Sequence, residues 1–436
     1  MRATHTLLSS ALCLPMLGQS IVSGPMPGYS ECHEGIIWLQ TDRPCKAGMM
    51  YWEETEPANI HYAAEALAEA KNAFAVDLIA DQVEPGNTYR YRVLLDDMPV
   101  EVTDTLRFHT QALWKYRTEP PDFTLATGSC AYINEPAYDR PGKPYGDGYG
   151  IFNSIADEHP DLMLWLGDNV YLREPDWGTW SGILHRYTHT RSTPELQRLL
   201  RGTHHYAIWD DHDFGPNDAD GSFANAALTQ KAFDLFWPNP PGTAPGVEGI
   251  ATMFSWSDVD FFLLDDRTFR VPPDVVTDTA VMFGDDQLDW LIRALKYSDA
   301  TFKIVASGGQ ILNSGAVYEN FATYPRERKH LLDRLNAEGL QNVIFLTGDR
   351  HHSVLSRMDQ PNGLPLYDLT VSPLTSGTHE PKEENKFAVE GTLVVERNFA
   401  TLRFSGPKKE RLLTVTVRDA SGKARWEKSI KAVQPK

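Results

Sequence analysis

Short runs of apolar residues, separated by turn signals, dominate the first quarter of the chain. In residues 88–95 (TYRYRVLL), tyrosine or valine alternates with arginine or leucine after a Pro-Gly turn, the period expected of a strand. A helix would place tyrosine and arginine on every face, so we favour a strand. Similar runs occur at 34–41, 49–54, 74–80 and 106–110. The pattern predicts a small β-sandwich.

From Phe123 the pattern changes to continuously apolar runs that alternate with segments of helical length. Six runs bounded by Gly or Asp suit buried central strands, and they are FTLATGS, DLMLWLGD, HHYAIWDD, DFFLLDD, FKIVASGG and NVIFLTGD. Predicted helices lie between them at 194–200, 285–298 and 325–339, the last with Pro at its start and Gly at its end. The alternation predicts an α/β layered domain, in which chemistry collects in loops beyond the carboxyl ends of the strands.

Two domains therefore account for the 436 residues. We expect a β-sandwich of the immunoglobulin or fibronectin type over 23–116 and an α/β domain over 123–436. Residues 111–122, with a Pro-Pro pair near their end, are the expected linker. Near the C-terminus, a predicted strand at 401–406 and a hairpin at 412–430 complete the second domain.

The N-terminus has the features of a signal peptide. Arg2 and His5 precede LLSSALCLPML, an apolar stretch too short to span a bilayer but long enough for a signal-peptide core. Small residues follow at Gly18, Ser20 and Ser23. We expect a signal peptide over residues 1–22 and an exported protein, periplasmic or secreted. No later segment is apolar over a membrane-spanning length.

The net charge bears on the kind of partner. The chain has 41 basic and 59 acidic residues, a formal net charge of −18. Such a surface repels a phosphate backbone, which argues against a general nucleic-acid binder. A phosphorylated substrate remains compatible with it if bound cations reverse the local field.

The cysteines are few. If Cys13 leaves with the signal peptide, Cys32, Cys45 and Cys130 remain. Cys32 and Cys45 are close in sequence, and we expect them to pair in an oxidising compartment. Cys130 is then the odd cysteine, either a small buried hydrophobic residue or a metal ligand.

An acidic cluster follows one of the predicted strands. The stretch IWDDHDFGPND (208–218) contains four aspartates, one histidine and one asparagine, with no lysine or arginine. Burying an unpaired carboxylate costs several kcal/mol unless it is neutralised, paired or bound to a metal. The stretch is therefore either a solvated acidic loop or a cation site.

Three other predicted strands end in comparable chemistry. TGSC carries Cys130, LGDNVY carries Asp168 and Tyr171, and TGDRHH carries Asp349 and His351. Thiolate, phenolate, carboxylate and imidazole groups are ligands of metals such as iron, zinc, manganese or calcium. These strand ends converge on one edge if the strands are parallel, and together they predict a metal site.

The motifs GSC, GDNVY, WDDHDFGPND and GDRHHS, in this order, resemble those of the PhoD-like (alkaline phosphatase D) family of calcineurin-type metallophosphatases. The resemblance runs from Phe123 to about Ser376. It implies a four-layer α/β/β/α core after a small β domain, and a cluster of iron (Fe3+) with calcium or another divalent ion. Ordinary calcineurin-type enzymes have Asp-x-His and Gly-His-x-His motifs, where this chain has Cys130 and Asp349.

The resemblance also assigns roles to residues. It implies that the metal ligands are Cys130, Asp168, Tyr171, Asp211, Asn217, Asp349 and His351, with Asp168 bridging the metals. His212 takes the place near the substrate and leaving group, where it either protonates the leaving alkoxide or donates a hydrogen bond to it. Asn169, Arg267 and Arg350 are candidates for contacting phosphate oxygens. The alternative role for Arg267 is a salt bridge with Asp265 or Asp266 beside it.

These ligands imply a hydrolase that acts on phosphoric esters. A two-metal centre stabilises charge on the phosphoryl oxygens and lowers the pKa of bound water, so the expected nucleophile is a metal-bound hydroxide. The sequence leaves alkaline phosphatase and phosphodiesterase activity both open. Loops at 132–149 and 238–249 would set the preference through the openness of the site.

Other classes of function explain less of the sequence. An exported, non-catalytic calcium-binding protein would use the acids structurally, but DDHDFGPNDAD lacks the glutamate and spacing of an EF-hand loop. An adhesion module built on residues 36–110 leaves the strand-end motifs unexplained. A serine esterase would need a G-x-S-x-G elbow that is absent where it is expected.

Overall fold

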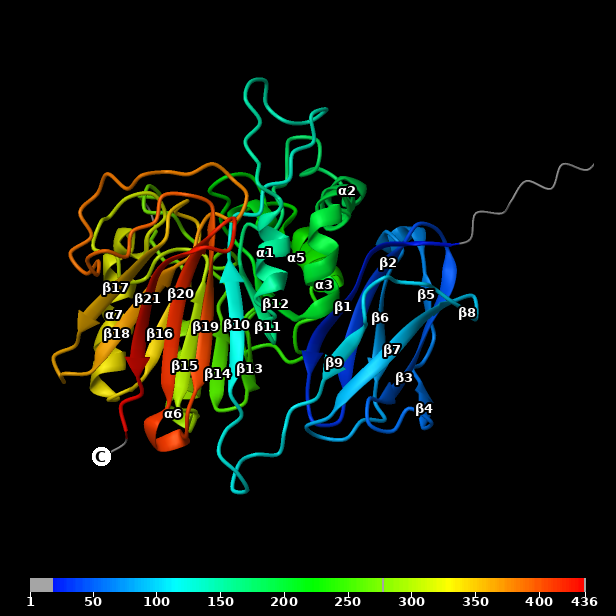
Figure 1. Cartoon of the computed structure of the whole chain (residues 1–436). Coiled ribbons are helices and arrows are strands. Elements are labelled where there is room, and N and C mark those ends of the chain that lie inside the picture. Colours follow the sequence, from blue (N-terminus) through cyan, green and yellow to red (C-terminus); the bar gives the residue numbers. More distant parts are fainter. Residues whose placement is uncertain (1–18, 277, 435–436) are drawn as a thin grey trace, which may run out of the picture.

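The computed structural model describes residues 19–276 and 278–434, which form a small β-sandwich beside a larger layered body (Figure 1). Most of the predicted signal peptide (1–22) lies outside the described residues, and strand β1 already begins at Ile21. No helix within the described ranges is long and apolar enough to cross a bilayer. The proposed domain limits, 23–116 and 123–436, stay a prediction.

Two sheets form the N-terminal sandwich. The first has the order β1-β2-β6 and the second β4-β3-β7-β8, with β5 paired to β3 and β9 paired to β7. Their strands are β1 (Ile21–Ser30), β2 (Gly35–Thr41), β3 (Cys45–Glu53), β4 (Ile60–Tyr62), β5 (Ala66–Ala68), β6 (Ala75–Ala80), β7 (Thr88–Leu95), β8 (Met98–Pro99) and β9 (Arg107–His109). The strands predicted at 34–41, 49–54, 74–80, 88–95 and 106–110 are all present.

Strand β2 is buried on both faces, which explains its continuous apolar run. Ile37 and Leu39 pack into the core of the sandwich, whereas Ile36 and Trp38 pack into the core of the larger body. The indole Nε1 of Trp38 donates a 2.8 Å hydrogen bond to the carbonyl oxygen of Leu235. The two parts of the molecule therefore share a hydrophobic interface.

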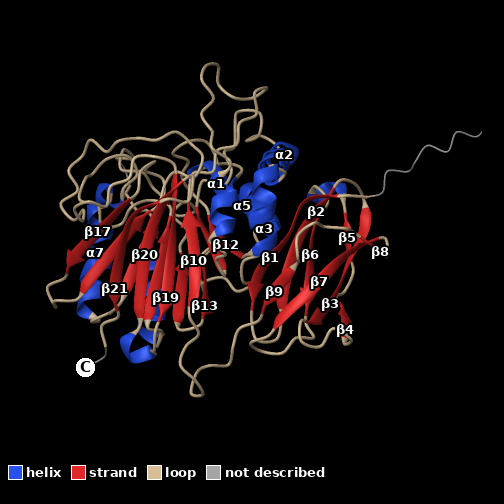
Figure 2. Ribbon diagram, in the orientation of Figure 1, coloured by secondary structure: helices blue, strands red, loops and turns tan. Residues whose placement is uncertain are grey.

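The larger body is built on two six-stranded sheets, drawn as the densely packed red arrows of Figure 2. Their orders are β12-β11-β10-β19-β20-β21 and β13-β14-β15-β16-β18-β17. The strands are β10 (Phe123–Gly128), β11 (Leu162–Leu166), β12 (His204–Ile208), β13 (Thr252–Trp256), β14 (Val259–Leu263), β15 (Phe302–Ser307), β16 (Val343–Thr347), β17 (Val354–Asp359), β18 (Pro365–Thr370), β19 (Asn398–Ser405), β20 (Leu412–Asp419) and β21 (Ala424–Lys431). The six predicted strands and the C-terminal hairpin are present.

Helices cover the outer faces. The α-helices are α1 (Ile151–Asp157), α2 (Trp180–Arg191), α3 (Gln197–Gly202), α4 (Asp211–Phe214), α5 (Ala226–Phe236), α6 (Asp285–Tyr297) and α7 (Pro325–Ala337); short 3₁₀ helices are η1 (Ala70–Asn72), η2 (Pro194–Leu196), η3 (Phe321–Thr323) and η4 (Lys408–Glu410). In β14, Phe261 packs between the sheets and Phe262 packs toward α6 and α7. This alternation follows from the two-residue period of a strand and produces the expected four-layer α/β/β/α fold.

The strands that carry the motifs are parallel neighbours. Strands β10, β11 and β12 are parallel in one sheet, and β14, β15, β16 and β18 are parallel in the other. Their carboxyl ends therefore meet at one edge of each sheet, as the sequence predicted.

The predicted disulfide between Cys32 and Cys45 is wrong. Both residues are free thiols, with the Sγ of Cys32 near the carbonyl oxygen of Gln111 and the Sγ of Cys45 near Oγ1 of Thr41. Cys32 precedes β2 and Cys45 follows it. A strand of this length separates its two ends by about 20 Å, far beyond the reach of a disulfide.

Candidate metal centre

The predicted ligands begin where three buried strands end. Cys130 follows β10, Asp168 follows β11 and Asp349 follows β16, and their φ angles are 61°, 53° and 63°. His351, with φ of 56°, is also left-handed. Such backbone is uncommon outside glycine, costs of order 1 kcal/mol or more, and concentrates at functional sites. The strained turns aim these side chains at one point beyond the sheet edges.

Three groups of donor atoms lie side by side at this point. Within each group the donor atoms all lie within 4.8 Å of one another; the groups are Cys130, Asp168 and His351; Asp168, Asp211 and His212; and Asp211, Asp218 and Glu319. Asp168 belongs to the first two groups, which is the position required of a bridging carboxylate. The Sγ of Cys130 lies 3.6 Å from Oδ2 of Asp168 and 3.2 Å from the hydroxyl oxygen of Ser372.

Tyr171 is part of the same cluster. It is buried against Cys130 and Tyr132, and its ring centroid lies 4.3 Å from that of His212. Its hydroxyl oxygen is buried and makes no hydrogen bond of ordinary geometry within the described chain. A buried polar atom without a partner costs about 1–3 kcal/mol, and a cation at this point would remove that cost.

Two further buried polar atoms also lack a partner that a cation would supply. Nδ1 of His212 and Oδ1 of Asn169 are buried without hydrogen-bond partners among the described residues. Asn169 is held by its own Nδ2, which donates to the carbonyl oxygen of Ile208 at 2.7 Å. Asn217 instead lies exposed in the cavity wall. Together with the thiol and carboxylates, these orphaned donors fit a site for metal ions.

The concentration of buried acids shifts their pKa values. Burial, then the charge of Asp211, raises the pKa of Asp168 well above its ordinary value. Burial, then Asp168, raises the pKa of the Cys130 thiol. Burial also raises the pKa of Tyr171 and brings that of Asp349 to about 7. Bound cations would reverse these shifts, because they favour the anionic forms.

His351 is held by residues from two other loops. The hydroxyl oxygen of Tyr145 lies 3.0 Å from its Nδ1 and that of Ser376 lies 3.4 Å from its Nε2. Asp349 lies in the cavity wall beside these groups but belongs to none of the three donor groups above. His352, which follows His351 in the chain, is buried.

The candidate site opens into a cavity of about 780 Å³. Eight of the predicted residues line it, namely Asp168, Tyr171, Asp211, His212, Asn217, Asp349, Arg350 and His351. Cys130, Asn169 and Arg267 do not. The loop at 132–149 contributes several lining residues, whereas the loop at 238–249 contributes none, and Phe236 and Trp237 before it are core residues.

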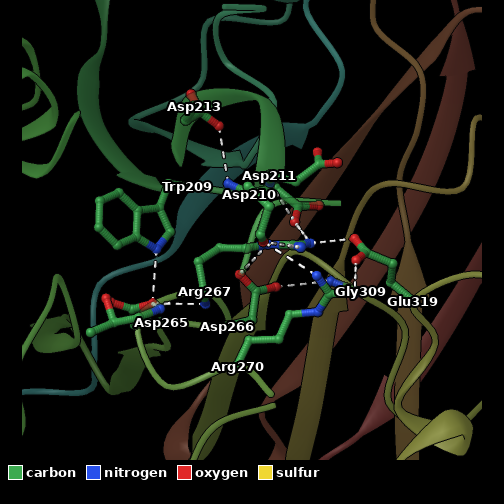
Figure 3. A network of polar contacts seen from close by, with 12 residues as sticks. Trp209, Asp210, Asp211, Asp213, Asp265, Asp266, Arg267, Arg270, Gly309 and Glu319 are labelled. Atoms are coloured by element: carbon green, nitrogen blue, oxygen red, sulfur yellow. Dashed lines mark hydrogen bonds and ion pairs between the residues drawn. The ribbon is translucent and has the colours of Figure 1, made fainter. Parts of the chain in front are cut away.

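Arg267 is not placed to contact a substrate, which corrects the prediction. Its side chain is fully buried, and Nη2 bonds both Asp210 and Glu319, the latter at 2.7 Å (Figure 3). Its Nε lies 3.5 Å from Asp266. Figure 3 shows Arg270 beside it on the same Glu319 carboxylate. Arg267 is thus a buried counter-ion for the acids behind the donor groups.

Arg350 does line the cavity, but its guanidinium already contacts other residues of the chain. Its Nη2 lies 2.8 Å from Oε1 of Glu383, and its Nη1 donates to Asn320 at 2.9 Å and to Gln310 at 3.1 Å. These contacts hold the guanidinium in the wall.

Two residues at the site were not predicted from the sequence. Glu319 lies in an irregular segment between β15 and η3, and Tyr145 lies in the long loop between β10 and α1. Neither follows a strand or belongs to a motif, so only the folded chain brings them in. Asp218, which was not among the predicted ligands, joins Glu319 and Asp211 in the third donor group.

Comparison with known proteins identifies this architecture. The fold is similar to a structure of PhoD, with a TM-score of 0.74 and 17% identity over 94% of this chain and 92% of the other. It is also similar to purple acid phosphatase PPD1 from yellow lupin (Lupinus luteus) seeds, with a TM-score of 0.69 and 10% identity over 93% of this chain and 74% of that one. The chain therefore shares the layered fold of these two structures and has its cluster of candidate ligands at the strand ends.

The family follows from the sequence match. Residues 125–426 match the PhoD-like phosphatase family, more than half of the chain, and the chain belongs to that family. Residues 18–113 match a domain of unknown function (DUF7800). Alkaline phosphatase D of Bacillus subtilis (strain 168) is 23% identical over 345 residues, which cover 67% of this chain but only 56% of that relative.

Proposed function

We propose that the chain hydrolyses phosphate esters at a centre of two or more metal ions. The observation that carries the proposal is the shared position of Asp168, whose carboxylate belongs to two neighbouring groups of donor atoms. Membership of the PhoD-like phosphatase family supports it. The non-catalytic alternatives leave this arrangement without a use.

We propose iron for the group that contains Cys130 and His351, with Tyr171 as a further ligand. Thiolate, phenolate and imidazole donors favour a transition metal over calcium or magnesium. The neighbouring group around Asp211 and Asp218 is rich in oxygen, which suits calcium or another divalent ion. Asn217 and Asp349, both in the cavity wall, are the remaining candidate ligands.

When bound, such a pair of ions supplies Lewis acidity to the phosphoryl oxygens and makes a nucleophile available near neutral pH. The residues of the chain position the reacting groups and supply the proton for the leaving group. His212 faces the cavity, and its backbone N–H donates to Oδ1 of Asp168 at 3.3 Å, which fixes the residue beside the shared carboxylate. We assign it the proton or hydrogen bond that the leaving alkoxide needs. Asn169 and Arg350 remain candidates for phosphate contacts.

The localisation proposal rests on the sequence of residues 1–22, whose charged start and apolar core suit export. We propose a periplasmic or secreted enzyme that acts on small phosphate esters.

The test combines substrates and metal analysis. Wild-type protein should hydrolyse 4-nitrophenyl phosphate, bis(4-nitrophenyl) phosphate or both, and should contain iron and a divalent ion. Asp168→Asn should lose activity by several orders of magnitude and should bind less metal, because the shared ligand is weakened. The surface variant Asp157→Asn is the control. Metal-loaded wild-type protein that cleaves neither ester would refute the proposal, and so would a fully active Asp168→Asn variant.

A further inference from the structure

Arg173 is a buried cation in the cavity wall that has no ion-pair partner among residues 19–276 and 278–434. Its residue exposure is only 8%, and it lines the cavity directly beside Tyr171. Its guanidinium carbon lies 4.2 Å from the ring centroid of Tyr132 and 5.3 Å from that of Tyr171. Its Nη1 makes a weak 3.3 Å contact with the carbonyl oxygen of Leu172. No carboxylate of the described chain forms a salt bridge with it.

The other buried arginines near this site are each paired with a carboxylate. Arg267 and Arg270 share Glu319, and Arg350 pairs with Glu383. Burying a cation without an anion costs several kcal/mol, and aromatic faces recover only about 1–2 kcal/mol of it. The cost indicates that the missing anion is supplied from the cavity, by a ligand.

The position of Arg173 indicates which part of a substrate it meets. Arg173 and His212 both pack against the Tyr171 ring, and the backbone N–H of Leu172, next to Arg173, donates a 3.2 Å hydrogen bond to the carbonyl oxygen of His212. Since His212 is assigned to the leaving group, Arg173 lies on the leaving-group side.

The wall beyond Arg173 is also basic and aromatic. The hydroxyl of Tyr132 donates to Oδ1 of Asp139 at 2.8 Å, and Arg140 and Lys143 follow on the same loop. Arg140 has a highly exposed side chain and only a 3.8 Å contact with Glu174. The cavity, of about 780 Å³, is far larger than a phosphate group and has the size of small-molecule sites. A cavity of this size has room for the organic part of a substrate against this wall.

We propose that Arg173 binds a second anionic group, a carboxylate or a phosphate, on the alcohol portion of the substrate. The proposal rests on the phosphoesterase function and adds a substrate class, phosphate esters whose leaving alcohol is itself an anion. Arg173 is the specificity-determining residue for that group, and the metal centre handles the scissile phosphoryl group. Hydrogen bonds of this charged kind change binding by about 10- to 100-fold.

The test compares three matched substrates: phenyl phosphate, 4-carboxyphenyl phosphate and 4-(phosphonomethyl)phenyl phosphate. Wild-type enzyme should prefer one or both anionic esters in kcat/KM, and the two arms separate a carboxylate from a phosphate. Arg173→Gln should lose that preference by about 10- to 100-fold while it retains its rate on phenyl phosphate. Arg173→Lys should keep part of the preference. Arg198→Gln, at an exposed ion pair on α3, should behave as wild type.

Arg173→Met provides a second neutral variant, because its chain still covers the Tyr132 ring if the glutamine variant does not fold. An equal loss on all three substrates would overturn the proposal, since Arg173 would then act on the scissile phosphoryl group. Unchanged kinetics in both folded neutral variants would overturn it too, and would make Arg173 a packing residue.

A binding measurement separates this proposal from the phosphoesterase function itself. By calorimetry, 4-carboxybenzyl phosphonate, which is not hydrolysed, should bind wild type more tightly than benzyl phosphonate does. Arg173→Gln should abolish the difference. If wild type cleaves no ester yet shows this Arg173-dependent difference, the proposed function fails and the anion subsite stands. Equal binding of benzyl phosphonate, 4-carboxybenzyl phosphonate and 4-(phosphonomethyl)benzyl phosphonate to wild type would refute the subsite.

Discussion

The hydroxyl oxygen of Tyr145 lies 3.0 Å from Nδ1 of His351, although the two residues are 206 positions apart. Tyr145 comes from the irregular loop between β10 and α1, and His351 comes from the turn after β16. The contact fixes the orientation of an imidazole that belongs to the donor group with Cys130 and Asp168. One loop thus both lines the cavity and positions a metal-ligand candidate.

Tyr145→Phe removes only the oxygen that holds His351. Residues that orient metal-bound histidines typically contribute 10- to 100-fold to metal affinity or activity. We expect a loss of about that size in metal retention during dialysis against a chelator, and a parallel fall in kcat. Tyr297→Phe, on an exposed tyrosine at the end of α6, is the control. Wild-type metal retention in Tyr145→Phe would mean that the contact does not position the ligand.

Tyr171→Phe tests whether the buried phenol binds iron. A phenolate bound to ferric iron absorbs visible light by charge transfer, so the loaded enzyme should be coloured and the variant bleached or shifted. The ring and its packing persist, so thermal unfolding should change little. Tyr132→Phe, which removes the neighbouring phenol oxygen bound to Asp139, should keep the band. A colourless, iron-free wild type that is fully active would refute iron while leaving phosphate-ester hydrolysis intact.

Arg267→Met tests the corrected role of that residue. Removing a buried arginine leaves Asp210, Asp266 and Glu319 without its charge, and breaking such clusters costs about 3–5 kcal/mol. Urea unfolding should show a loss of that order in the free energy of unfolding. Arg334→Met, which breaks a more exposed pair with Asp289, should cost at most about 1 kcal/mol. A stable Arg267→Met enzyme with only a raised KM would restore the phosphate-contact prediction.

The environment of His204, at the junction of the β-sandwich and the larger body, predicts that acid lowers the stability of the protein. Its Nδ1 lies 2.8 Å from the carbonyl oxygen of Gly28, and its Nε2 accepts from the backbone N–H of His109 at 3.0 Å, so the neutral ring is required. Burial lowers the pKa of His204 from 6.5 to about 3. The unfolded chain takes up a proton below pH 6.5 and the folded chain does not. Stability is therefore complete above pH 6.5 and is lost as the pH falls toward 3.

The size of this loss can be measured against a matched variant. Between pH 7.5 and pH 5, His204 should contribute a loss of about 2 kcal/mol. His204→Gln should be less stable than wild type at pH 7.5 but should lose about 2 kcal/mol less on acidification. His33→Gln, on an exposed histidine, should follow the wild-type curve. An identical pH dependence in His204→Gln and wild type would contradict the assignment.

Local patterns were sufficient to predict the layered fold. The six apolar runs from Phe123 onward are strands, because a run this short and this apolar is stable only between two covered faces. Strand β1 was missed, since Pro25, Pro27 and two glycines suppress any local strand pattern. Its pairing with β2 and its packing against the larger body outweigh that weakness.

The strand-end residues of the site were also readable from the chain. Cys130, Asp168, Asp211 and Asp349 each follow a predicted strand, and parallel strands bring their carboxyl ends together whatever the loops do. The roles of these residues as ligands remain predictions that the experiments above address.

Tertiary structure alone decided which charges are paired and which face the cavity. Arg267 and Arg173 look alike in sequence, each a few residues beyond a strand. Yet the first is buried among three carboxylates, whereas the guanidinium of the second forms no salt bridge within the part of the chain that the structure describes. The sequence pattern also could not predict that Glu319 and Tyr145 lie at the site, or how far apart Cys32 and Cys45 are. Periodicity reports which face of an element is buried, but the partner of a side chain depends on segments that are distant along the chain.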